Sequence, residues 1–128
     1  MKTKCVALFL ALLGAAVSLP QDAQIPPALH ALFEAERAFA KRCGEVGIRA
    51  SFFEFFTDDA IVFRPHPVKY KEAVENRPAP PNPLMFALEW EPIFGEVSAA
   101  GDMGYDTGPS VFIDKTAENA EPQYGFFF

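Results

Sequence analysis

Apolar residues recur at intervals of three and four positions between Pro26 and Gly47, and this spacing predicts one amphipathic helix. A second run that begins at Ile48 repeats the spacing, with Glu54 opposite its apolar side, and predicts a second helix. Most of the phenylalanines in these segments are therefore expected in the core. The apolar positions are Leu29, Leu32, Phe33, Phe39, Ala40 and Cys43 in the first helix, and Ile48, Phe52, Phe55 and Phe56 in the second.

The middle of the chain is divided by prolines. Residues 60–64 are rich in strand-forming side chains and predict a short strand, which Pro65 and Pro67 end, so that His66 lies in an extended connector. Residues 70–77 predict a short helix, and the proline-rich stretch 77–83 predicts a connector without regular structure.

Beyond residue 85 the hydrophobic period changes to two. Phe86, Leu88 and Trp90 alternate with polar or small residues and predict a strand with one buried face, while Pro92 predicts a bulge or bend. Further strands are expected at 96–100, at 103–113 after a tight turn, and at 124–128 after an acidic loop. Helices followed by hairpins predict an α+β domain in which helices pack on an antiparallel sheet.

The N-terminus has the layout of a secretory signal peptide. Lys2 and Lys4 precede an uncharged run that ends in small residues, and this run is shorter than the ~20 residues of a membrane span. Cleavage is expected near Ser18, which divides the chain into a leader (1–18), a linker (19–27) and one domain (28–128). The protein is thus expected to be secreted or periplasmic, with no membrane association after cleavage.

Charge and composition exclude several classes of partner and site. Loss of Lys2 and Lys4 with the leader lowers the net charge from −6 to −8, so nucleic acid is not an expected partner. Cys43 is then the only thiol, which excludes an intrachain disulfide. The chain has two histidines, His30 and His66, without metal-ligand spacing, and it has no phosphate-binding glycine motif. Neither a metal nor a cofactor is expected.

Glu36 falls near the middle of the apolar stripe of the first helix. A buried carboxylate persists only when it is paired, so the favoured interpretation is a structural glutamate held by a backbone amide or an arginine such as Arg64. The alternative is a pocket acid or base whose pKa is raised by desolvation. These two environments shift the pKa of Glu36 in opposite directions.

Four segments, in this order, resemble secreted members of the nuclear transport factor 2-like superfamily, and among them the SnoaL-like group, many of whose members have no assigned function. They are ERAFA (36–40), FFTDDAIVFRPHPV (55–68), WEP (90–92) and GDMGYDTGP (101–109). The resemblance implies a cone-shaped fold in which a bent antiparallel sheet wraps around helices and encloses a pocket. It also implies that the last strand continues beyond Phe128 and that another strand follows, in roughly 20 to 30 further residues.

The superfamily includes both enzymes and binding domains, and none of its catalytic residue sets matches positions here. The polar and aromatic residues expected to line the pocket are Glu36, Arg64, Trp90 and Tyr105. The favoured function is an exported domain that binds a small apolar or amphipathic molecule without catalysis. One alternative is a cofactor-independent lyase, isomerase or hydrolase that uses a pocket carboxylate. Another is an interaction domain that forms a homodimer through its sheet face.

Overall fold

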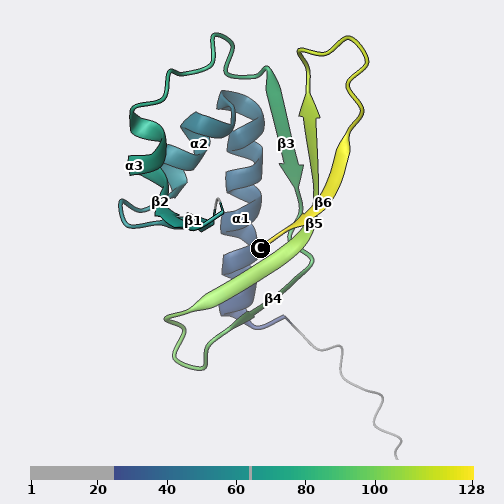
Figure 1. The fold of residues 1–128 in the computed structure, drawn as a ribbon. Helices are drawn as coiled ribbons and strands as arrows, with labels where there is room; N and C mark the ends of the chain where they lie inside the picture. The colour runs from purple at the N-terminus through teal and green to yellow at the C-terminus, as the bar shows by residue number, and fades with distance from the viewer. Residues whose placement is uncertain (1–24, 64) are drawn as a thin grey trace, which may run out of the picture.

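A computed structural model describes residues 25–63 and 65–128 of the chain (Figure 1). Two helices, α1 (Pro27–Val46) and α2 (Ile48–Phe55), meet at Gly47, and they confirm the two predicted helices. Gly47 has a φ of 87°, which favours glycine, and a Cβ at this position would overlap the carbonyl oxygen of Pro83. The turn between the helices is therefore tied to the proline-rich connector.

The main sheet is antiparallel and is built around one long strand, β5 (Gly104–Asp114). The second half of β5 pairs with β3 (Phe86–Trp90) on one side and with β6 (Gln123–Phe127) on the other, whereas its first half pairs with β4 (Phe94–Val97). The predicted strand at 96–100 is thus wrong in its bounds. The backbone N–H of Gly101 donates to the carbonyl of Ser98, so this segment turns instead of extending.

The predicted irregularity at Pro92 is a β-bulge. Trp90 pairs with Ser110 and Phe94 pairs with Thr107, so four steps along the β3–β4 edge correspond to three along β5. Pro92 is buried in the bulge. At the facing position of β5, a Cβ on Gly108 would overlap the carbonyl oxygen of Glu91, which explains the glycine there.

The segment between the helices and the sheet forms a small hairpin and a helix. Strand β1 (Ile61–Phe63) pairs with β2 (Pro67–Lys69), and α3 (Tyr70–Glu75) follows directly. The sequence predicted β1 and the short helix but assigned Pro67 to a connector. A proline is compatible with this strand because β2 has a single neighbour and leaves its other edge unpaired within the described structure.

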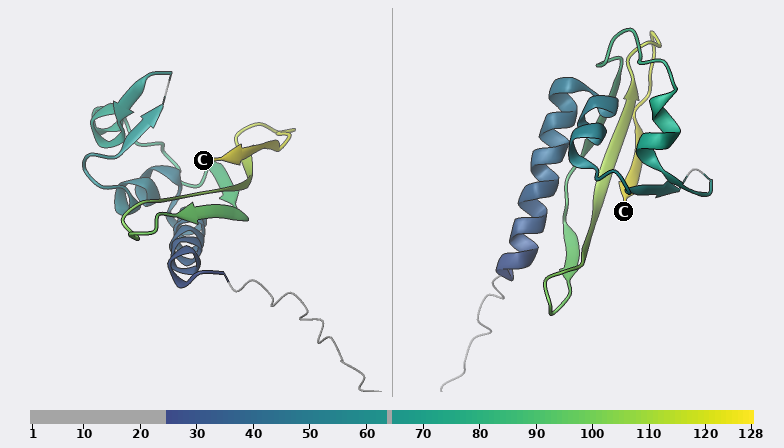
Figure 2. Two further views of the ribbon diagram at one scale, coloured as in Figure 1. Left: turned by 90° about the horizontal axis from the view of Figure 1, so that it is seen from below. Right: turned by 90° about the vertical axis from the view of Figure 1, so that its left-hand side faces the viewer.

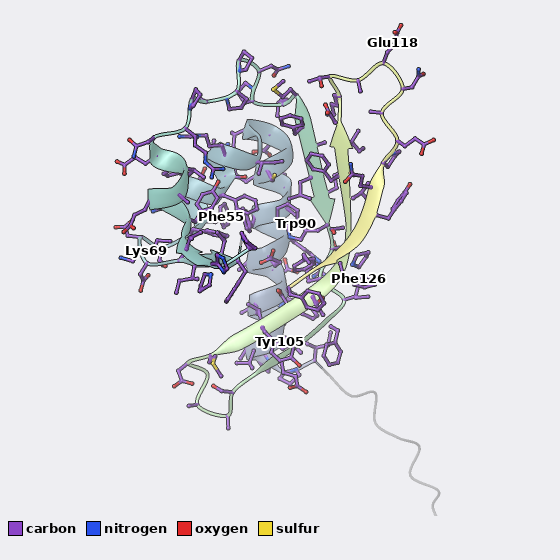
Figure 3. The ribbon with its side chains drawn as sticks, in the orientation of Figure 1. Phe55, Lys69, Trp90, Tyr105, Glu118 and Phe126 are labelled. Carbon is purple, nitrogen blue, oxygen red and sulfur yellow. The ribbon has the colours of Figure 1, made fainter. Side chains whose placement is uncertain are left out.

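The core is formed by aromatic rings from both layers. Phe39 of α1 is buried, and its ring lies 4.8 Å from those of Phe52 and Phe55 and 5.0 Å from that of Trp90, centroid to centroid. Phe55 keeps 40% of its surface exposed, so this ring lies at the margin of the core (Figure 3). The phenylalanines of the two helices therefore connect α1, α2 and β3.

An α+β architecture, with helices packed on an antiparallel sheet, is confirmed: α1 lies across β3, β4 and β5. In all three ribbon views the C-terminus lies between the β1–β2 hairpin and the sheet (Figures 1 and 2). The predicted leader at 1–18, most of the linker, and Arg64 lie outside the described residues. Within the described residues, no helix has the length and apolar character needed to cross a membrane.

Candidate functional site

A cavity of about 230 Å³ lies between the helices and the sheet. Two aromatic residues at the end of the chain form part of its wall. Its lining is largely aromatic and includes two carboxylates. The residues are Glu36 and Phe39 of α1, Phe52 and Phe56 at α2, Leu88 and Trp90 of β3, Asp106 and Ser110 of β5, and Phe127 and Phe128 at the end of the chain.

Glu36 and Trp90 form the central polar contact of this cavity. The indole N–H of Trp90 donates a hydrogen bond to Oε1 of Glu36 at 2.6 Å. Helical spacing brings Glu36 to the inner side of α1, and the alternation along β3 brings Trp90 to the inner face of the sheet. Among the described residues, the partner of Glu36 is therefore an indole and not a backbone amide, while Arg64, the arginine expected from the sequence, lies outside them.

Asp106 is the second carboxylate of the cavity. One of its oxygens, Oδ2, is buried and has no hydrogen-bond partner among the described residues. The side chain lies on the inner face of β5, on the same side as Ser110, because the two positions are an even number of residues apart. A buried carboxylate oxygen that lacks a donor costs stability, and the side chain to which it belongs lines the cavity.

Burial raises the pKa of both carboxyl groups. For Glu36, burial has the largest effect; the Trp90 N–H opposes it by stabilising the charged form, and the negative charge of Asp106 raises the pKa further. For Asp106, burial alone raises the pKa. The cavity thus holds two acids that release their protons at higher pH than ordinary carboxylic acids do.

The four residues predicted for the pocket have separate positions. Glu36 and Trp90 line the cavity together. Tyr105 does not line it: its side chain is 51% exposed, lies near Phe94 with a centroid distance of 6.3 Å, and belongs to the opposite face of β5 from Asp106 (Figure 3). Arg64 lies outside the described residues.

Sequence reasoning missed Asp106 and Ser110 because it took the neighbouring Tyr105 as the inward residue. Alternation along a strand allows either phase, and a tyrosine is more often buried than an aspartate. The pairing of Trp90 with Ser110 determines the phase, since residues opposite each other in a ladder share a face. The inward positions of β5 could therefore have been deduced from Trp90 once the register was known.

The cavity lacks the donor set of a metal site. Across the described residues, no group of three or more histidine, cysteine, aspartate or glutamate side chains is placed to hold a metal ion. Its chemistry consists of two carboxyl groups, one indole N–H and one hydroxyl within aromatic walls. Such a lining suits hydrogen bonding or proton transfer with a small organic molecule.

Comparisons of the chain with protein-family models, curated proteins and solved structures found no match.

Proposed function

We propose that the chain is an exported domain of the nuclear transport factor 2-like superfamily, and that the cavity at Glu36 and Asp106 binds a small, largely apolar molecule without catalysis. The α+β order of helices, hairpin and antiparallel sheet supports the family assignment, as does a cavity between helices and sheet. The pattern of residues 1–18 supports export. The cone shape of the sheet, with the further strand that the resemblance implies, stays a prediction.

One observation supports a binding function most directly: the buried Oδ2 of Asp106, which has no partner in the described structure. A ligand O–H or N–H that reaches this atom would remove a penalty of about 1 to 3 kcal/mol. The aromatic walls would contact the rest of the molecule. The cavity volume of about 230 Å³ is small for a ligand site, so the fitting molecule has one ring or two.

Trp90 provides the test, because it is the only tryptophan of the chain and lines the cavity. We expect 4-ethylphenol to change its fluorescence and to bind more tightly than 4-ethylanisole, in which a methyl group replaces the donated proton. Asp106→Leu should abolish this preference, whereas Glu89→Gln, on an exposed carboxylate of β3, should retain it. Equal binding of both compounds by the unaltered protein would contradict the proposal.

A second candidate, acid–base catalysis without a cofactor, is favoured by the raised pKa of Glu36 next to Asp106. A carboxyl group with a pKa closer to neutrality is a better general acid or base at physiological pH. In this case the protein should exchange the proton beside a ketone carbonyl for deuterium in D₂O, and Glu36→Gln should stop the exchange while Glu34→Gln should not. The absence of exchange across a panel of small aryl ketones, measured by NMR, would leave binding as the function.

The homodimer alternative is supported by apolar side chains on the outer face of the sheet. Tyr124 is 80% exposed and Phe126 is 64% exposed, and their pairing with Val111 and Pro109 puts both on the face away from the cavity, where Tyr105 also lies. Clusters of exposed aromatic residues are typical of interfaces. Sedimentation analysis should then give twice the monomer mass, and Phe126→Ser combined with Tyr124→Ser should return the protein to a monomer.

A further inference from the structure

A second cavity, of about 380 Å³, lies where α2, α3 and the proline-rich connector meet. It shares Phe52 with the cavity at Glu36 and is otherwise lined by different residues. Most of its walls are apolar, and two arginines are its only charged side chains. The lining consists of Ile48, Arg49, Phe52, Tyr70, Val74, Arg77, Pro78, Pro80, Pro83 and Phe86.

Neither Arg49 nor Arg77 forms an ion pair with a carboxylate in the part of the chain that the structure describes. The other two described arginines behave differently. Arg37 contacts Glu34 and Glu91, and Arg42 contacts Glu45 and Glu54. Lys41, Lys69 and Lys71 also pair with acidic side chains, and Lys115 is the remaining unpaired cation of the described structure.

This distribution is unexpected in an acidic chain. With a net charge of −6, carboxylates outnumber cations, so a surface arginine generally finds a partner. Arg49 and Arg77, which have no carboxylate partner among the described residues, both line this apolar cavity. Arg49 also has its guanidinium 5.5 Å from the centre of the Phe53 ring, and this contact restricts its position.

We propose that this second cavity binds a small amphipathic carboxylate, with the carboxylate held by Arg49 and Arg77 and the apolar body against Phe52 and Phe86. The planar guanidinium group matches a carboxylate through two parallel hydrogen bonds. Arg49 is half-buried and Arg77 is exposed, so the charged end of the ligand stays near water while its body is buried.

The surroundings of the cavity favour an elongated ligand. A hollow of about 240 Å³ shares Arg49, Pro80 and Pro83 with it. Another of about 120 Å³ shares Tyr70, Val74 and Arg77. An aliphatic chain can follow such a series of hollows, whereas a compact ring fills only one of them. The site is independent of the cavity at Glu36, whose carboxylates would repel the same ligand.

Calorimetric titration with decanoate and decanol tests this site, since the two compounds share a chain and differ in charge. We expect decanoate to bind at least about tenfold more tightly than decanol, because charge-assisted hydrogen bonds replace neutral ones. The double variant Arg49→Gln/Arg77→Gln should lose this difference. Lys115→Gln removes the other cation that is unpaired among the described residues, and it should leave both affinities unchanged.

Equal affinities for the two compounds, no binding of decanoate, or unchanged binding by the double variant would each overturn the proposal. If the double variant does not fold, Arg77→Glu on the exposed side chain provides the measurement, and it should abolish decanoate binding. A decanoate affinity that Asp106→Leu changes and Arg77→Glu does not would place the ligand in the other cavity and also refute this one.

Discussion

The two cavities share the ring of Phe52, yet they hold opposite charges in different ways. In the first, Glu36 and Asp106 extend from regular elements toward the interior, and their burial raises their pKa values. In the second, Arg49 and Arg77 lie nearer the surface, without carboxylate partners in the described structure. Charge placed inside the fold reduces its stability, whereas charge placed at a rim affects binding while costing the fold little.

The largest losses of stability and of ligand affinity are expected from substitutions of two glycines, one beside each cavity. Gly108→Ala should lower the free energy of unfolding by more than about 3 kcal/mol, because the new methyl group overlaps the Glu91 carbonyl. Gly47→Ala should displace Pro83 and weaken decanoate binding, while leaving the Glu36–Trp90 contact in place. Gly44→Ala is the control, since no atom outside the adjacent residues and the surrounding helix backbone lies within 4 Å of its added carbon. Chemical denaturation measures the stability of the three variants, and titration measures their decanoate affinity. A stable Gly108→Ala protein would contradict the bulge geometry.

Trp90→Phe tests the cost of charge in the first cavity. It keeps an aromatic ring but removes the donor to Glu36, so we expect a loss of about 1 to 3 kcal/mol at pH 7. Adding Glu36→Leu should recover part of this loss, because the unpaired carboxylate is then gone. Glu34→Gln, which affects only an exposed ion pair on the same helix, should cost under about 1 kcal/mol. Additive losses in the double variant would show that Glu36 is not desolvated.

Asp106→Asn should stabilise the protein by about 1 kcal/mol at pH 7, because it replaces a buried charge without a partner by a neutral group. The pKa of Asp106 is raised above its ordinary value of 3.8, so folding takes up a proton between the two values. Stability therefore falls as the pH rises through this window, and the loss is complete above the folded pKa. Denaturation from pH 3 to 8 should show a weaker dependence in Asp106→Asn than in the Glu89→Gln control.

The smallest losses of stability are expected from substitutions of the arginines. Arg42→Gln breaks contacts with Glu45 and Glu54 and should cause a small loss of stability that salt reduces. Arg49→Gln and Arg77→Gln should change stability by less than about 0.5 kcal/mol each. Thermal melting at low and high salt compares the three. A larger loss at Arg49 than at Arg42 would indicate that Arg49 supports the fold and is not available to a ligand.

Much of the fold was predictable because its elements are periodic. The stripe from Phe33 to Cys43 predicted α1, the alternation from Phe86 to Trp90 predicted β3, and Pro92 predicted the bulge. The hairpin partner β2 was not predicted, because three residues that include a proline carry no periodic signal. The hydrophobic pattern thus predicted the long helices and strands. It did not predict a short strand that is defined only by its pairing with a neighbour.

The site was predicted less completely than the fold. The helical stripe singled out Glu36, since a charge within an apolar pattern is visible in one dimension. The partner that this residue takes depends on how α1 lies on the sheet, which the sequence does not specify, and so Trp90 was expected only as a neighbour in the pocket. Asp106 follows a tyrosine in a strand whose phase is determined by its register with β3. Arg49 and Arg77 stand out only because neither forms an ion pair among the described residues.

The extra residue of the bulge and the glycine opposite it have a joint evolutionary consequence. The β3–β4 edge uses four steps where β5 uses three, and the surplus brings the Glu91 carbonyl onto Gly108. A relative shortened by one residue between Trp90 and Phe94 would keep both registers and relieve that crowding, so position 108 would then accept a side chain. In the present chain that side chain would overlap the Glu91 carbonyl, so the deletion is expected to come first. Homologues are therefore expected to vary at these two places together, in that order of mutation.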